Sequence, residues 1–438
     1  MLGPFLLMPD GAALRPPMKR LSTLRFYYAA CFVALGIYLP FFPRWLEARG
    51  VHGAAMGMVA ASLPAMGLVG PPLFGILSDR LGLRGTLLRL ACVGAFACMG
   101  ALGVAFASGH PLGFAGIFAA VLAFSFFRSS MISLADVITL ELAGGGGGYA
   151  RTRLWGSLGF LVAAVAAGRF LDPTAPSTLP LAVSAPLFVA LLTAWTLPTR
   201  GAARAAPPHA GAPRILSDGQ PVRGSRSVTP ALPALGRASA LLARADLRLF
   251  FGASFLGQLA HSSYDLCFTL HLRDLGANNA LVGASWALGV LSEVALMAGA
   301  TWVFRRFTPP WLLVTAFFGA AVRWTLIASV FSIPALLALQ PLHGLSFALM
   351  WLASLAYVKE SAPRDALATA QGLFSAAVAA GSVLGMPLWG ALYRRSGGSV
   401  TFGLAAFASA AAASVALVWA RRSTARNGME PGPSGTNR

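Results

Sequence analysis

The feature that most constrains this chain is a series of apolar segments, each long enough to cross a membrane. An α-helix rises 1.5 Å per residue, so about 20 apolar residues span the hydrocarbon core of a bilayer. Twelve such segments run over residues 22–46, 56–78, 86–107, 112–139, 154–171, 179–197, 248–272, 279–304, 310–331, 334–358, 367–393 and 399–420. We therefore expect an all-α membrane protein with twelve transmembrane helices.

The composition supports this class and decides how the high positive charge is interpreted. Hydrophobic residues make up 57% of the 438-residue chain and charged residues only 11%, which is more apolar than soluble proteins are. Of the 33 Lys and Arg residues, 25 fall in or beside one set of loops and tails, and two, Arg128 and Arg323, lie deep inside segments. The opposite set holds six: Arg44, Arg49, Arg169, Arg273, Arg394 and Arg395. Because positive residues are retained in the cytoplasm, the net charge of +19 reflects topology, and we expect no nucleic-acid partner.

One long interruption divides the segments into two groups of six. Residues 198–247 are rich in Pro, Ala, Gly, Ser and Arg, a composition that cannot bury a core and is typical of a flexible linker. The end of the linker, from Ala231 to Arg248, has the pattern of an amphipathic helix on the inner membrane surface. We expect six-helix bundles over 22–197 and 248–420, with cytoplasmic tails at 1–21 and 421–438.

A trace of internal repetition relates these two groups. Four residues near the end of the first segment recur near the end of the seventh at a constant offset of 226: Tyr38, Phe42, Leu46 and Gly50 become Tyr264, Phe268, Leu272 and Gly276. A repeat at this place favours two pseudo-symmetric halves.

The polar stretch between the second and third segments, GILSDRLGLRG over residues 75–85, resembles a known signature. Charged side chains cost about 2.5–3.5 kcal/mol at a bilayer centre, so this stretch belongs at the cytoplasmic surface. It resembles the loop G-x-L-x-D-R-x-G-x-R of the major facilitator superfamily, with matches at Gly75, Leu77, Asp79, Arg80, Gly82 and Arg84. The resemblance implies a transporter that works by alternating access. The resemblance also implies that this loop gates the cytoplasmic side of the transporter, and that Asp79 contacts the start of the eleventh helix near Leu367 in the outward-open state.

A second resemblance is narrower and points to a branch of that superfamily. Five fragments resemble the phenylpropionate permeases, a group of proton symporters similar to nucleoside symporters: YLPFFPRWL (38–46), RTRLWGSLGF (151–160), WALGVLSEV (286–294), LHGLSF (342–347) and AQGLF (370–374). The stretch RSSMISLAD (128–136) departs from the branch because it lacks a proline. This resemblance implies proton-coupled uptake of a small organic substrate, such as an aromatic carboxylate, across the inner (plasma) membrane.

Ionisable residues inside apolar segments are rare and usually face a cavity or a charged partner. Glu293 lies about 20 Å along its segment, near the bilayer centre, and His261 and Asp265 share one helix face. Two carboxylates in one low-dielectric cavity cannot both ionise readily, so one should hold a proton near neutral pH. We assign proton coupling to Glu293, Asp265 and His261, and add Asp136 near the cytoplasmic end. The alternative is that structural Glu–Arg or Asp–His pairs hold the helices together.

Arg128, about 24 Å into its segment, is the candidate grip for an anionic substrate, because a planar guanidinium suits a carboxylate. The alternative is a permanent pair with an acid. Arg323 is expected to be structural. The candidate walls of the binding cavity are Tyr38, Tyr264, Trp286, His343, Phe347 and Gln371. For His343 and Phe347, ordinary interhelical packing is the competing interpretation.

Other functional classes lack their motifs. The five glycines at 144–148 come without the Lys and Ser/Thr of a phosphate-binding loop, so they indicate a hinge. The four cysteines lie in apolar runs, and no metal-ligand cluster is evident. We therefore expect a monomeric, multi-pass carrier without cofactor or enzymatic activity, contacting lipid, driven by the proton gradient. The alternatives are proton-antiport efflux, nucleoside-type symport, a membrane acyltransferase using His343 with an acid, and a non-transporting sensor.

Overall fold

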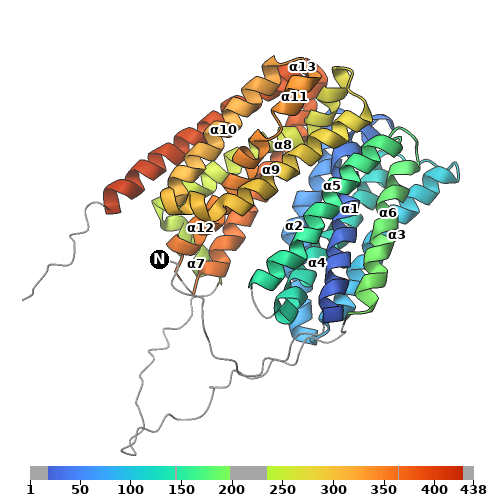
Figure 1. The fold of residues 1–438 in the computed structure, drawn as a ribbon, viewed down its shortest axis with the longest axis horizontal. Coiled ribbons are helices and arrows are strands. Elements are labelled where there is room, and N and C mark those ends of the chain that lie inside the picture. The colour runs from blue at the N-terminus through green and yellow to red at the C-terminus, as the bar shows by residue number, and fades with distance from the viewer. Residues whose placement is uncertain (1–17, 144–145, 198–233, 364, 428–438) are drawn as a thin grey trace, which may run out of the picture.

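The computed structural model describes residues 18–143, 146–197, 234–363 and 365–427, and this part of the chain consists of helices joined by short turns and loops, without strands (Figure 1). The first group of helices is α1 (Met18–Glu47), α2 (Gly53–Leu81), α3 (Arg84–Ala107), α4 (Phe114–Ala143), α5 (Gly146–Phe170) and α6 (Thr178–Trp195). After α7 (Ala234–Ala243) follow α8 (Ala245–Asp274), α9 (Asn279–Arg306), α10 (Pro309–Ser329), α11 (Ile333–Ala338), the π-helical turn η1 (Gly344–Ala348), α12 (Leu349–Ser361) and α13 (Leu367–Asn427). Most of the expected N-terminal tail, most of the linker and the last residues of the expected C-terminal tail lie outside the described residues.

Eight of the described helices are long and apolar enough to cross a membrane: α1, α2, α3, α4, α6, α9, α10 and α13. The expected all-α membrane class is confirmed. The number eight falls short of the twelve expected because α5 and α8 carry polar groups, among them Arg153 and His261, because one expected segment is broken, and because two others run together as one helix.

The expected segment 334–358 is a broken helix rather than a continuous one. It consists of α11, a turn, the π-helical η1 and α12. Pro341 lies in this turn and has no N–H for a helical hydrogen bond. The expected segments 367–393 and 399–420 run together as α13, which bends at Gly397, where φ is +73°. Glycine adopts this left-handed conformation without a steric penalty.

The helices form two groups that contact each other along a seam (Figure 1). The first group consists of α1–α6 and the second of α8–α13, and the helices of each group pack on one another. Across the seam, α2 contacts α13 and α5 contacts α9. Two glycines permit the closest approach. A Cβ added at Gly57 would lie 2.3 Å from the carbonyl oxygen of Met386, and one at Gly283 would lie 2.1 Å from that of Ala164. The two glycines are 226 positions apart, which extends the internal repeat.

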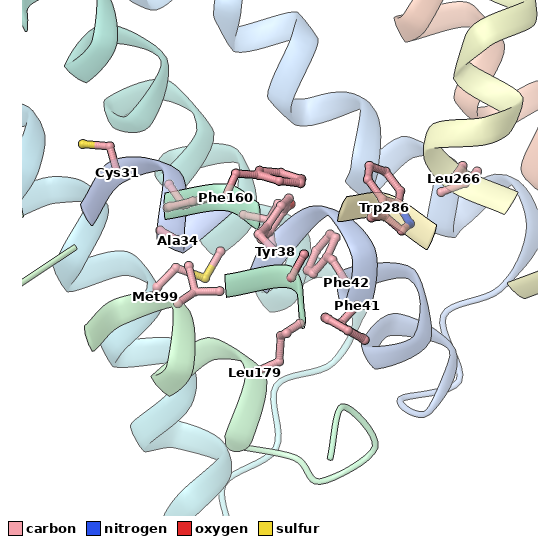
Figure 2. Packing of buried hydrophobic residues seen from close by; sticks show 14 of the residues in the cluster. Cys31, Ala34, Tyr38, Phe41, Phe42, Met99, Phe160, Leu179, Leu266 and Trp286 are labelled. Carbon is pink, nitrogen blue, oxygen red and sulfur yellow. The ribbon is translucent and has the colours of Figure 1, made fainter. Parts of the chain in front are cut away.

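The four repeated positions also share their geometry. Tyr38 stacks on Phe42 with ring centroids 4.2 Å apart, and Tyr264 stacks on Phe268 at 4.5 Å. Both helices then end at a glycine with positive φ, 74° at residue 50 and 88° at residue 276. Figure 2 shows Tyr38 and Phe42 of α1 between Phe160 of α5 and Trp286 of α9, within a buried aromatic cluster at the seam.

The expected amphipathic helix at 231–248 corresponds to α7, which is shorter and packs on the protein. It contacts α8 and α13, and Leu241 is buried against their side chains while Leu242 is exposed. Arg244 then donates to the carbonyl oxygen of Ser361 and to Asp246. Part of its apolar face is thus covered by α8 and α13, while Leu242 stays exposed, and its place on the inner membrane surface stays a prediction.

Candidate functional site

A buried arginine is the centre of a polar cluster in the second group of helices. Arg323 of α10 is 0% exposed, and its guanidinium contacts the rings of Tyr264, at 4.3 Å, and Trp324, at 4.7 Å. It donates to three neutral acceptors: His343 Nδ1 at 3.0 Å, Ser346 Oγ at 3.3 Å and Gln340 Oε1 at 3.1 Å. Among the described acids, none pairs with it. Arg323 was expected to be a structural residue, and the sequence did not indicate its central position.

The hydrogen bonds of His343 determine where its proton lies. A guanidinium can only donate, so Nδ1 of His343 accepts from Arg323. In the neutral ring the proton is therefore on Nε2, which lies 2.8 Å from Oε1 of Glu293 and donates to it. This arrangement disfavours a second proton on His343, because an Nδ1–H would face the guanidinium N–H. Glu293 is consequently the group in this pair that is free to exchange a proton.

A second carboxylate–imidazole pair lies beside the first. Nε2 of His261 is 3.6 Å from Oδ1 of Asp265, one helical turn along α8. The rings of His261 and His343 are 5.4 Å apart, and Phe347 stacks on His261 at 4.8 Å. The structure thus brings together the candidates that the sequence proposed on three different segments.

Trp286 joins the same cluster through aromatic and polar contacts. Its ring lies 5.3 Å from that of Tyr264, and its Nε1 donates to Thr269 at 3.2 Å. Gln340 and Trp324 belong to this cluster but were missed. Gln340 precedes His343 by three residues, and this polar residue in an apolar segment was the available signal.

Asp136 lies in the other group of helices, away from these pairs. It accepts a hydrogen bond from the hydroxyl of Tyr28 at 2.6 Å, and Nε of Arg153 lies 3.8 Å away. The guanidinium of Arg153 stacks over Phe32 at 4.6 Å. Neither Tyr28 nor Arg153 was singled out from the sequence. Asp136 is therefore a member of a paired cluster that links α1, α4 and α5.

Arg128 differs from Arg323 because it has no hydrogen-bond or ion-pair partner among the described residues. It is half-buried on α4 and interacts electrostatically with Tyr38. The hydroxyl of Tyr38 is itself buried without a partner in this part of the structure. Among the described residues, the guanidinium of Arg128 and the hydroxyl of Tyr38 are thus both without a hydrogen-bond partner and could bind the same ligand. Gln371, by contrast, is exposed near the start of α13.

The residues of the expected gating loop lie at the opposite end from the closest seam contacts. The Asp79 side chain is 76% exposed and pairs with Arg84 at 3.4 Å, while Arg84 also pairs with Glu141 of α4. In this structure the partner of Asp79 is therefore Arg84 rather than the start of α13. The remaining loop residues complete the end of α2: Gly75 borders open space, Arg80 is exposed, and Gly82 caps the helix.

The other end of the seam is closed by polar contacts in addition to the glycines. Glu47 of α1 pairs with Arg273 of α8, and Arg44 donates to Asn279. A small cavity of about 230 Å³ lies at this end, lined in part by His52. These contacts close the seam at this end.

Comparison with known proteins decides the family. The model of the MFS_1 like family matches residues 20–404. The chain belongs to this family. It is therefore a membrane transporter of the major facilitator superfamily, and the resemblance drawn from the signature loop and the permease fragments is confirmed.

The relatives of this transporter are named for different substrates. Maltose permease of Geobacillus stearothermophilus is 30% identical over 364 residues, covering 82% of this chain and 83% of the relative. A probable 3-phenylpropionic acid transporter of Escherichia coli (strain K12) is 25% identical over 387 residues, covering 85% and 91%. The solved nucleoside transporter NupG superposes with a TM-score of 0.74 at 18% identity, over 92% of this chain and 100% of that chain. The last likeness concerns the fold alone.

Proposed function

We propose that this transporter is a proton-coupled symporter, which carries a small organic anion such as an aromatic carboxylate across the inner membrane by alternating access. In this proposal, twelve spans form two pseudo-symmetric halves over 22–197 and 248–420. The linker 198–247 and both tails are cytoplasmic. The carrier works as a monomer without a cofactor, and its partners are the substrate, the proton and membrane lipid. The matched geometry around Tyr38 and Tyr264 supports the two halves.

The observation that carries the proposal is the pair of carboxylates held on buried imidazoles, Glu293 on His343 and Asp265 on His261. An ionised carboxylate is costly to enclose in a low-dielectric interior, whereas a protonated one is not. A cavity lined by such groups therefore closes more readily when a proton is bound. This linkage between protonation and closure is what a proton-driven carrier requires.

The free guanidinium of Arg128 supports an anionic substrate. A carboxylate bound there would place its charge in the first group of helices while the proton is bound in the second. Anion and proton together add no net charge. The carrier with both bound therefore changes from one conformation to the other at a lower electrostatic cost than the carrier with the anion alone.

The experiment is uptake into proteoliposomes driven by a pH gradient that is alkaline inside. Labelled 3-phenylpropionate should accumulate, and protein-free liposomes correct for passive entry of the undissociated acid. Labelled maltose tests the second candidate, a neutral sugar, which the similarity to maltose permease favours. Labelled uridine tests nucleoside transport. Extrusion of 3-phenylpropionate would identify proton-antiport efflux instead, and a lack of flux for all three probes would contradict the proposed substrate class.

Arg128→Ala should raise the KM for 3-phenylpropionate uptake about 10–100-fold, because a charge-assisted contact with a carboxylate contributes about 1.5–3 kcal/mol. Arg128→Lys should recover part of this loss, since it restores the charge without the planar fork. The control is Arg169→Ala, which removes an exposed arginine at the end of α5. A KM unchanged in Arg128→Ala would remove this residue from the substrate site.

A further inference from the structure

Gln340 makes contacts that fix the direction of its amide oxygen. The residue is fully buried in the turn between α11 and η1. Its Nε2 donates to the carbonyl oxygen of Leu336 at 2.7 Å. Its Oε1 accepts from Nη2 of Arg323 at 3.1 Å and from the hydroxyl of Tyr264 at 3.0 Å. Because a guanidinium only donates, the atom facing Arg323 must be the oxygen.

The surroundings of Arg323 make this contact consequential. The ionisable groups facing it are Tyr264, His261 and Asp265 from α8, Glu293 from α9, and His343 before η1, while α13 contributes the uncharged Phe402 beside Trp324. A buried guanidinium gains most from a carboxylate. Arg323 instead binds neutral acceptors, and its Nε has no partner among the described residues. Both nearby carboxylates are paired with imidazoles.

We infer that Gln340 is a positioning residue for proton coupling, which holds Arg323 on His343 and keeps the guanidinium from pairing with Glu293 or Asp265. The inference rests on the proposed proton-coupled function. While Arg323 is held, the imidazole of His343 lies between the guanidinium and the carboxylate of Glu293. The guanidinium then stabilises the ionised carboxylate less than direct pairing would, so the carboxylate can accept a proton. Direct pairing with Arg323 would stabilise the ionised carboxylate and expel that proton.

Two substitutions at position 340 should move the pH dependence of transport in opposite directions. Gln340→Leu removes the acceptor, so Arg323 pairs with a carboxylate, and the pH of half-maximal 3-phenylpropionate uptake should fall by about one unit. Gln340→Glu gives Arg323 a carboxylate of its own and places a negative charge near Glu293. The midpoint should then rise by about one unit. A general loss of stability would not produce shifts of opposite sign.

The control is Gln258→Leu, which removes another buried glutamine, one whose Nε2 donates to Ser382; it should leave the midpoint unchanged. Midpoints that stay in place, or that move together in both variants at position 340, would overturn the inference. Wild-type uptake without pH dependence would instead overturn the proposed function. In that case infrared titration of buried carboxyl groups in purified wild-type protein and Gln340→Leu decides the inference, since an unmoved carboxyl titration contradicts it without requiring transport.

Discussion

Glu293→Gln should retain exchange of substrate across the membrane and lose accumulation driven by a pH gradient. The amide resembles the protonated acid in shape and charge, so the cavity can still close over substrate. The amide does not titrate, so it cannot take up or release a proton, while its oxygen can still accept from Nε2 of His343 in place of the carboxylate at 2.8 Å. Counterflow of labelled 3-phenylpropionate should persist. The steady-state ratio of inside to outside concentration should fall to about 1, the value for uncoupled equilibration.

Asp265→Asn provides the comparison for this result. Its carboxylate is paired less closely, at 3.6 Å from His261, and we expect it to assist rather than carry the proton, so accumulation should decrease without disappearing. Glu293→Gln that still concentrates substrate, with the wild-type pH dependence, would reduce Glu293 to a structural partner of His343.

Gly57→Leu and Gly283→Leu should each abolish most transport by preventing closure of the end of the seam that the proposed topology places outside. A Cβ at either position would lie 2.1–2.3 Å from a backbone carbonyl oxygen across the seam. Overpacking of this kind costs about 1–3 kcal/mol where side chains can adjust, and backbone atoms adjust less. A cost of about 3 kcal/mol shifts the equilibrium between the two states about 100-fold toward the state that is open at this end of the seam.

The shift can be measured by labelling His52→Cys with a membrane-impermeant maleimide, in a background without the native cysteines. His52 lines the small cavity at this end of the seam, which the proposed topology places outside, so labelling should increase in both glycine variants. The matched controls are Gly67→Leu on α2 and Gly299→Leu on α9, where an added Cβ meets no atom within 4 Å. Unchanged labelling together with normal uptake would show that the glycine contacts do not close the exterior.

Much of the fold follows from hydropathy, because a bilayer admits few arrangements of a long apolar chain. The first apolar segment was expected over 22–46 and corresponds to α1, Met18–Glu47. Broken helices follow less directly from a hydropathy profile. The π-helical turn η1 and the preceding turn, which bring Gln340 and His343 to Arg323, lie within a segment whose average hydropathy predicts one straight helix.

The candidate site could be predicted only in part from the sequence, for a similar reason. Hydropathy gives the depth of Glu293 and spacing gives the shared face of His261 and Asp265, but neither gives the rotation of one helix against another. Helix rotation determines that His343, rather than Arg323, contacts Glu293. It also determines that Asp136 pairs with Tyr28 and Arg153, while Arg128 stays unpaired among the residues that the structure describes. The internal repeat was more informative, since Tyr38 and Tyr264 occupy equivalent stacks.

Proton movement caused by substrate itself tests the central claim most directly. 3-Phenylpropionate is added outside de-energised, weakly buffered proteoliposomes, and the external pH is recorded. Protein-free liposomes and Glu293→Gln proteoliposomes account for passive entry of the acid. Wild-type protein should make the medium more alkaline than either control, in fixed proportion to the carboxylate taken up. Carboxylate uptake without this extra alkalinisation, or with acidification, would contradict proton symport.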